Sequence, residues 1–233
     1  MPFKVTTAPA IEPLLVTDPI VKQTLRVIDT AEDTLITMLL TRAREAAEQL
    51  TWRALITQGL TLTMDQFPCP GQNTASSNWY GPSWGVGPGP LTVSRPDGTT
   101  GYEIYLPRSP IQSVTSINYY DPAGALQTLD PAQYIVDTIS EPARIVPAPG
   151  AAWPSTQNRI NAVQVVFQAG YGNSGVAVPA SIMHWILLTT ATFYENREMV
   201  AVLNKGKVEL LPYVDGLLDS YALRSFNPPD YWV

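Results

Sequence analysis

The stretch PASIMHWILLTTATFYENRE (residues 179–198) decides the fold of this chain. It opens on a proline, whose fixed φ suits the first turn of a helix. Large apolar residues follow near helical spacing, and the stretch ends on polar and charged residues. These apolar residues are Ile182, Trp185, Ile186 and Phe193. The pattern predicts an amphipathic helix that packs against other helices, and it carries neither a nucleophile–base pair nor metal-ligand spacing.

Three further helices are predicted. The first spans Pro19 to Val27, with Asp18 as N-cap and the proline in the first helical position. The second covers residues 31–52 and follows an approximate capping box that begins at Thr30. Its wide, alanine-rich apolar face fits either an ordinary core helix or a helix that faces a neighbouring subunit. The third begins near Pro212 and is followed by a Pro-Pro pair that ends any helix.

In the middle of the chain the apolar period changes from helical to two. Leu60, Leu62 and Met64 alternate with polar residues, which predicts a half-buried strand. Asp121-Pro-Ala-Gly124 has good turn chemistry, because proline presets one backbone angle and glycine accepts a positive φ. Further strand signals cover residues 103–111, 114–129, 134–137, 143–146 and 162–170. We therefore expect an antiparallel sheet of several short strands.

These elements predict an α+β protein. Residues 1–56 and 173–223 supply the helices of a bundle, and residues 57–172 form an antiparallel β subdomain inserted between them. Residues 224–233 form an extended C-terminal tail.

Residues 68–101 form a long loop within the β subdomain. The loop is rich in glycine, proline, serine and asparagine, and it contains Trp79, Tyr80 and Trp84. A connection of this length without periodicity indicates a functional or a disordered segment. Its aromatic residues are candidates for a contact surface. Two alternatives stay open: the loop folds over its own sheet, or the aromatic rings stack on sugars in a carbohydrate-binding module.

The C-terminal tail ends in large apolar side chains: Phe226, Tyr231, Trp232 and Val233. A free terminus is usually frayed and polar, so these residues are candidate anchors for a groove on another protein. Docking of the tail onto its own domain is the alternative.

Composition and charge exclude several classes of protein. The formal net charge of -6 argues against a broad nucleic-acid-binding face. It does not exclude a protein along which DNA slides without binding tightly. Apolar residues never run for the roughly 18 positions that a membrane-spanning helix needs, so we expect no membrane contact. The only cysteine, Cys69, cannot form an internal disulfide and is no candidate nucleophile.

Catalytic, metal and cofactor sites are not expected. His184 is the only histidine, and its place on an apolar helix favours a packing role over that of a base. The polar end of residues 179–198 is expected to be solvated or to face a neighbouring subunit. This end and the predicted helix at residues 31–52 supply four candidate subunit-interface residues: Arg42, Glu195, Arg197 and Glu198.

An ordered set of segments resembles the head-tail connector (adaptor) proteins of tailed bacteriophages. The resemblance covers most of residues 14–223. The segments are residues 50–58, 104–117, 129–134, 143–154, 167–172 and 178–198, preceded by the short N-terminal helix. The loop at residues 68–101 is longer than the family pattern, and the aromatic tail also departs from it.

The resemblance implies a structural virion protein without enzymatic activity. Such proteins form a dodecameric ring beneath the portal protein, extend the DNA channel and present a platform for the next tail or stopper protein. DNA passes through the lumen without specific binding. The implied location is the neck of the virion, after assembly in the host cytoplasm. A stopper or another tail-completion protein is the alternative within the same class.

The first prediction concerns the tail. Because the family's C-terminal segment typically reaches into the portal, removal of residues 224–233 should abolish portal binding and leave the remaining chain folded. Co-sedimentation of the truncated and full-length chains with portal rings measures this. Undiminished binding by the truncated chain would contradict the anchor role.

Overall fold

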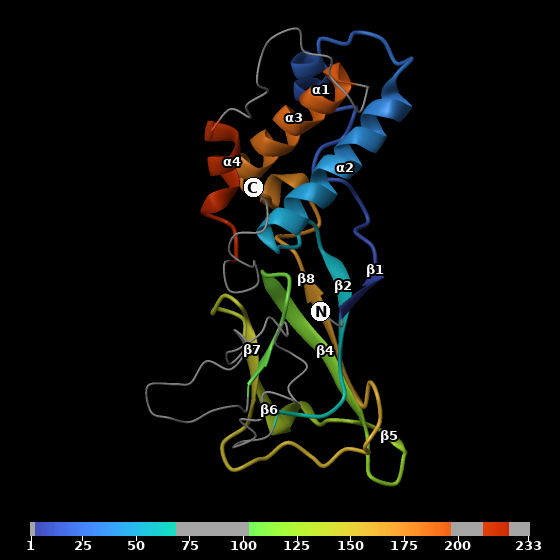
Figure 1. The fold of residues 1–233 in the computed structure, drawn as a ribbon, viewed down its shortest axis with the longest axis vertical. Coiled ribbons are helices and arrows are strands. Elements are labelled where there is room, and N and C mark those ends of the chain that lie inside the picture. The colour runs from blue at the N-terminus through green and yellow to red at the C-terminus, as the bar shows by residue number, and fades with distance from the viewer. Residues whose placement is uncertain (1–2, 69–102, 197–211, 224–233) are drawn as a thin grey trace, which may run out of the picture. The chain divides into compact units, whose positions relative to one another are not determined.

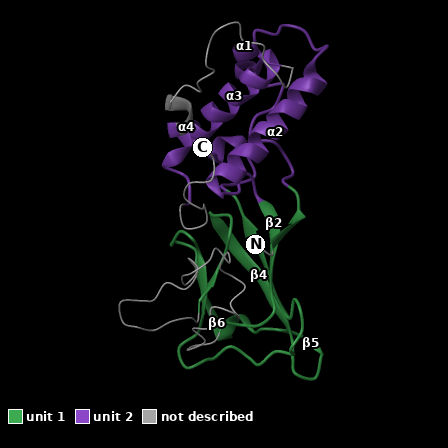
Figure 2. Cartoon of the chain, in the orientation of Figure 1, with its two compact units in different colours: residues 1–8, 58–170, 230–233 green, residues 9–57, 171–229 purple. Residues whose placement is uncertain are grey.

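The computed structural model describes residues 3–68, 103–196 and 212–223 (Figure 1). They form helices and antiparallel strands, so the predicted α+β class is confirmed. The chain divides into two compact units, shown in separate colours in Figure 2. The β unit comprises residues 1–8, 58–170 and 230–233, and the helical unit comprises residues 9–57 and 171–229.

Four α-helices build the helical unit: α1 (Pro19–Leu25), α2 (Asp33–Thr51), α3 (Ala180–Glu195) and α4 (Pro212–Asp219). All four begin within a few residues of their predicted starts. A proline occupies the first turn of α1 and directly precedes α3, where its fixed φ is compatible with helix entry. A short 3-10 helix, η2 (Gly175–Ala177), precedes α3.

The predicted capping box before α2 is wrong. The N-cap is Glu32, and it makes no side-chain capping hydrogen bond. Thr30 contributes only its carbonyl oxygen, which accepts from the Asp33 amide at 3.3 Å. The N-terminal end of α2 is instead held by Lys22 of α1, whose Nζ lies 2.8 Å from the carboxylate of Asp33.

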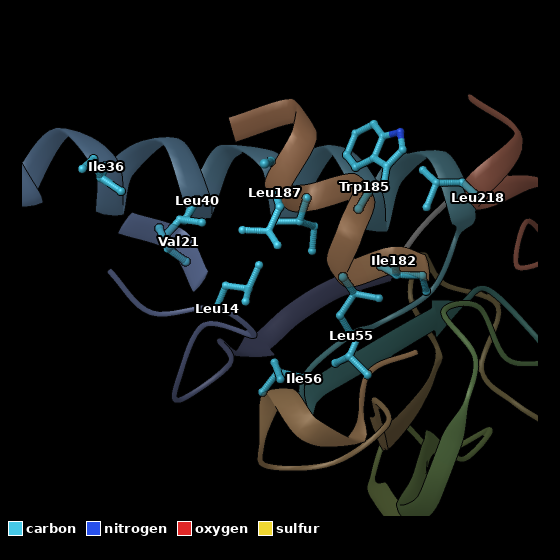
Figure 3. Close-up of a cluster of buried hydrophobic side chains, with 14 of the residues drawn as sticks. Leu14, Val21, Ile36, Leu40, Leu55, Ile56, Ile182, Trp185, Leu187 and Leu218 are labelled. Atoms are coloured by element: carbon cyan, nitrogen blue, oxygen red, sulfur yellow. The ribbon is translucent and has the colours of Figure 1, made fainter. Parts of the chain in front are cut away.

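Buried side chains from both segments of the helical unit form one core (Figure 3). Helix α2 contributes Ile36 and Leu40, and α3 contributes Ile182 and Ile186. Each is at most 2% exposed, and burial of such a side chain contributes about 1.5–3 kcal/mol. Further core residues are Leu14, Val21, Leu55, Ile56, Trp185, Leu187 and Leu218.

The β unit contains a five-stranded antiparallel sheet in the order β1-β2-β8-β4-β5. Its strands are β1 (Phe3–Thr7), β2 (Gln58–Met64), β4 (Ile111–Tyr120), β5 (Leu126–Thr128) and β8 (Val163–Ala169). Alternate residues of β2 and β8 are buried, as the period of two predicts. Two register shifts interrupt the pairing of β4 with β8, which indicates bulges in β4.

The remaining strands form a second sheet, so the prediction of a single sheet is wrong. Its order is β3-β7-β6, with β3 (Ile104–Tyr105), β6 (Tyr134–Asp137) and β7 (Arg144–Pro147). A 3-10 helix, η1 (Pro131–Gln133), precedes β6. The predicted strand at residues 103–111 is divided between β3 and the first residue of β4.

The turn between β4 and β5 is confirmed. Gly124 has a φ of 86°, the left-handed region that glycine occupies without strain. One carboxylate oxygen of Asp121 accepts from the amides of Ala123 and Ala125 at 3.0 and 2.9 Å. A side-chain hydrogen bond from Gln127 and these backbone bonds lower the pKa of Asp121, because they stabilise its charged form.

Gly175 generates a prediction for the helical unit. A Cβ at this position would lie 1.9 Å from the carbonyl oxygen of Pro13, a backbone atom that cannot move aside. Gly175→Ala should therefore destabilise the protein by about 1–3 kcal/mol in urea unfolding.

Gly216, on α4, is the matched control. A Cβ there meets no atom within 4 Å, so Gly216→Ala should raise stability by about 0.5–1 kcal/mol through helix propensity. Equal effects of the two changes would contradict the close packing at Gly175.

Candidate assembly surface

Two of the predicted contact residues lie within the described part of the chain. Arg42 is exposed on α2, and Glu195 is the exposed last residue of α3. The other candidates lie outside the described residues: Trp79, Tyr80, Trp84, Arg197, Glu198, Phe226, Tyr231, Trp232 and Val233.

Arg42 also contacts its own subunit. Its guanidinium carbon lies 4.6 Å from the centre of the Phe193 ring on α3, within cation–π range. This contact holds the arginine across the two helices while the side chain stays exposed. Phe193 is therefore half-buried beneath Arg42, at the margin of the predicted apolar face.

The exposed side of α2 forms a stripe along the helix. Thr34, Met38, Arg42, Glu45 and Gln49 recur at spacings of three and four residues, and all five are exposed. Met38 is 59% exposed, which is unusual for a large apolar side chain on an otherwise polar face. We call these five residues the α2 stripe.

The end of α3 that carries Glu195 is fixed against α2. The hydroxyl of Tyr194 donates a hydrogen bond to a carboxylate oxygen of Glu32, the N-cap residue of α2. At the opposite chain end of the unit, the Leu223 amide donates to the Thr51 carbonyl at 3.0 Å. These hydrogen bonds tie α2 to α3 and to the segment after α4. The α2 stripe and Glu195 are therefore carried by helices that are bonded to one another.

A buried charge network stabilises α2 on its inner side. Arg44 is only 7% exposed, and its Nε lies 2.7 Å from an oxygen of Glu12. Its Nη1 lies 2.9 Å from an oxygen of Glu48, one helical turn later. The second Glu48 oxygen accepts from the Leu55 amide at 2.9 Å. The network links the N-terminal segment, α2 and the segment that follows α2.

Burial opposes the charge of Arg44, but the attraction of Glu48 and Glu12 outweighs it and raises the pKa of the guanidinium above its ordinary value. Sequence analysis missed this network. The only signal was the spacing of Arg44 and Glu48, which many exposed helical pairs share.

No cluster of three potential metal-ligating side chains occurs within residues 3–68, 103–196 and 212–223. His184 is exposed on α3, so the expected packing role is wrong. Among the helices that the structure describes, none has the length and apolar character needed to cross a bilayer.

Arg44→Ala should destabilise the protein by about 3–5 kcal/mol, because it leaves the buried carboxylate of Glu48 and the half-buried carboxylate of Glu12 without their cation. Arg42→Ala removes the same side chain from the exposed side of the same helix and should cost about 0.5–1 kcal/mol. Urea unfolding of both variants measures the difference. Similar losses would mean that the buried network contributes no more than a surface contact.

Comparison with known proteins identifies a shared fold. No family model and no curated protein matches the chain. Among solved structures, a chain from the neck of an empty gene transfer agent (GTA) particle computed with C6 symmetry matches with a TM-score of 0.68 at 22% identity. A chain from the virion of a native GTA particle matches with a TM-score of 0.65 at 22% identity. A chain from the neck of a native GTA particle computed with C12 symmetry matches with a TM-score of 0.63 at 20% identity. Each match covers 95% of both chains. The fold of this chain is therefore one that occurs in the neck of a gene transfer agent particle.

Proposed function

We propose that this chain is a structural virion protein, a head-tail adaptor that forms a ring beneath the portal, extends the DNA channel and docks the tail. The observation that carries the proposal is the fold shared with chains from particle necks over 95% of both lengths. A match of that extent includes both the helices and the sheets. The ordered segments that resemble connector proteins support the same role independently of the fold.

A ring requires two different contact patches on each subunit, because cyclic symmetry joins subunits head to tail. The solved necks were computed with C6 and C12 symmetry, which fits a ring of six or twelve copies. We assign one patch to the α2 stripe, where Met38 supplies exposed apolar area and Arg42 supplies charge. The exposed Glu195 at the end of α3 belongs to the second patch, with Arg197 and Glu198 beyond it in sequence.

The partners follow from this position in the particle. The tail at residues 224–233 contacts the portal, and the loop at residues 68–101 contacts the next tail component or a neighbouring subunit. DNA passes through the lumen without sequence-specific binding, and no catalytic step is involved. The protein works in the virion neck and is assembled in the host cytoplasm.

Co-sedimentation with purified portal rings tests the proposal. The full chain should sediment with the portal in a fixed subunit ratio, and electron microscopy of the complex should show an added ring. Recruitment only by a portal that already carries another adaptor would instead indicate a stopper. No association under any salt condition would contradict a neck position next to the portal.

A pair of variants tests the subunit contact. Met38→Asp places a charge in the α2 stripe and should reduce ring formation on the portal by about tenfold or more, since an unpaired carboxylate is costly in an interface. Ile160→Asp changes a side chain of the β unit that is 77% exposed, and it should leave ring formation unchanged. Thermal unfolding shows whether both variants fold. Equal ring formation by the two folded variants would contradict a role of the α2 stripe in the subunit interface.

A further inference from the structure

Strand β1 contributes little to the core of the β unit. It lies at one edge of the five-stranded sheet, so β2 is its only neighbour among the described strands. None of the residues Phe3–Thr7 belongs to the buried core, and four of the five are exposed. The Phe3 ring also contacts the guanidinium carbon of Arg108, 5.5 Å from the ring centre. The place of β1 in the sheet therefore depends chiefly on its pairing with β2, and a strand with so few buried contacts detaches at low cost.

The edge of β2 that β1 covers needs a partner strand. β2 has the sequence QGLTLTM, without charge or proline, and it pairs with β8 without a register shift. Regular, uncharged edges of this kind pair readily with other chains, whereas charges and bulges discourage such pairing. β1 has both protective features, because it carries Lys4 and its register with β2 shifts between Val5 and Thr7. A β1 strand is therefore suited to cover β2 and to end the sheet.

The connection between β1 and the helical unit is not held by hydrogen bonds. None of the hydrogen bonds described for the chain involves residues 8–11. Ala8, Ala10 and Ile11 are exposed. The chain is fixed again at Glu12, whose carboxylate pairs with Arg44 of α2. Residues 8–11 can therefore change direction without the loss of a described hydrogen bond.

The other connections between the two units are different. The Thr57 amide donates to the Gly172 carbonyl at 3.0 Å, where the chain passes from the helical unit to β2. The Tyr171 amide donates to the Leu55 carbonyl at 3.2 Å, where the chain returns after β8. These bonds fix both connections to the helical unit. Among the connections that the structure describes, the one after β1 is therefore suited to act as a hinge.

Residues 8–11 also set how far β1 can reach. Thr7 and Glu12 are five residues apart, and an extended chain spans at most about 3.3–3.6 Å per residue, which allows roughly 17 Å between their Cα atoms. Pro9 and Pro13 favour extended backbone at the residues that precede them. The connection can thus carry β1 to any β2 edge within this distance of Glu12, in the same subunit or in another.

We propose that β1 is exchanged between neighbouring subunits when the ring forms, so that β1 of each subunit covers β2 of the next copy of the chain. This inference rests on the proposed neck function. In a single chain the same pairing is made internally (Figure 1). Exchange of an identical element preserves the contacts between β1 and β2, so its cost is confined to the rearrangement of residues 8–11. Each subunit gives one strand and receives one, which is the head-to-tail contact that closes a ring.

A disulfide between β1 and β2 distinguishes internal pairing from exchange. Lys4 and Thr61 are register partners, and neither is buried. Lys4→Cys and Thr61→Cys are combined with Cys69→Ser, which removes the only native thiol. The matched control carries Asn118→Cys and Thr128→Cys in the same background, because these register partners belong to the β4–β5 hairpin of one chain. Both variants are assembled on portal rings, oxidised and analysed on a denaturing gel without reductant.

The bond between positions 4 and 61 should join different chains at least about tenfold more often in assembled rings than in the free chain at equal concentration, because the exchange accompanies assembly. The control bond should stay within one chain in both states. Complete rings in which the bond between positions 4 and 61 also stays within each chain overturn the inference and leave the neck function intact.

Electron microscopy of the unsubstituted chain on the portal gives a second measurement that does not depend on the folding of a variant. Density for residues 8–11 should lead from Glu12 to the sheet of a neighbouring subunit. Density that leads to the sheet of the same subunit overturns the exchange.

Failure of the unsubstituted chain to join the portal would count against the neck function itself. The exchange is then tested on the purified full chain at high concentration, where an exchanged strand links copies into dimers or longer oligomers. Interchain bonds between positions 4 and 61, with the control bond still within one chain, support the exchange. A monomer in which the bond closes within the chain overturns it.

Discussion

The burial of α2 against α3 is the constraint on which the helical unit depends. These helices belong to two chain segments, residues 9–57 and 171–229, that meet only in the folded state. Bringing such distant segments together costs loop-closure entropy, which grows slowly with length. The apolar side chains of both helices, among them Leu40 and Ile186, offset this cost by leaving water together.

The buried charges near α2 have a different role from the apolar core. Replacement of such a network by apolar residues is often neutral or stabilising in other proteins, so its presence says little about net stability. Its geometry is more informative, because Glu48 joins Arg44 to the backbone amide of Leu55 and thereby fixes how the chain leaves α2. The sequence then passes directly into β2.

Local chemistry explains which elements could be predicted. The start of α1 follows from the fixed φ of Pro19, and the hairpin at Asp121–Gly124 follows from a carboxylate and a glycine that suit one turn. The capping box failed because α2 begins at Asp33, past Thr30, and Asp33 pairs with Lys22 of α1 instead of capping the helix together with Thr30. Division into two sheets depends on pairing between distant strands, which periodicity alone does not specify.

The candidate surfaces were harder to predict for the same reason. Arg42 and Arg44 are two residues apart on one helix, yet Arg42 is exposed, whereas Arg44 lies on the buried side of α2 and pairs with Glu12 of another segment. Likewise, Lys4, Thr61 and Ser116 share one side of the five-stranded sheet only through the register of β1, β2, β8 and β4, with two shifts along β4. A period of two in each strand separately cannot align hydroxyl groups across four strands.

The backbone pairing at the junction of the helical unit has a consequence for modularity. The Thr57 amide donates to the Gly172 carbonyl at 3.0 Å, and the Tyr171 amide donates to the Leu55 carbonyl at 3.2 Å. The chain leaves the helical unit after Thr57 and re-enters it at Tyr171. The two bonds therefore hold the exit and the entry of the chain side by side within the helical unit. Such a clamp lets the segment between them change in length or be exchanged for another domain while the helical scaffold keeps its geometry.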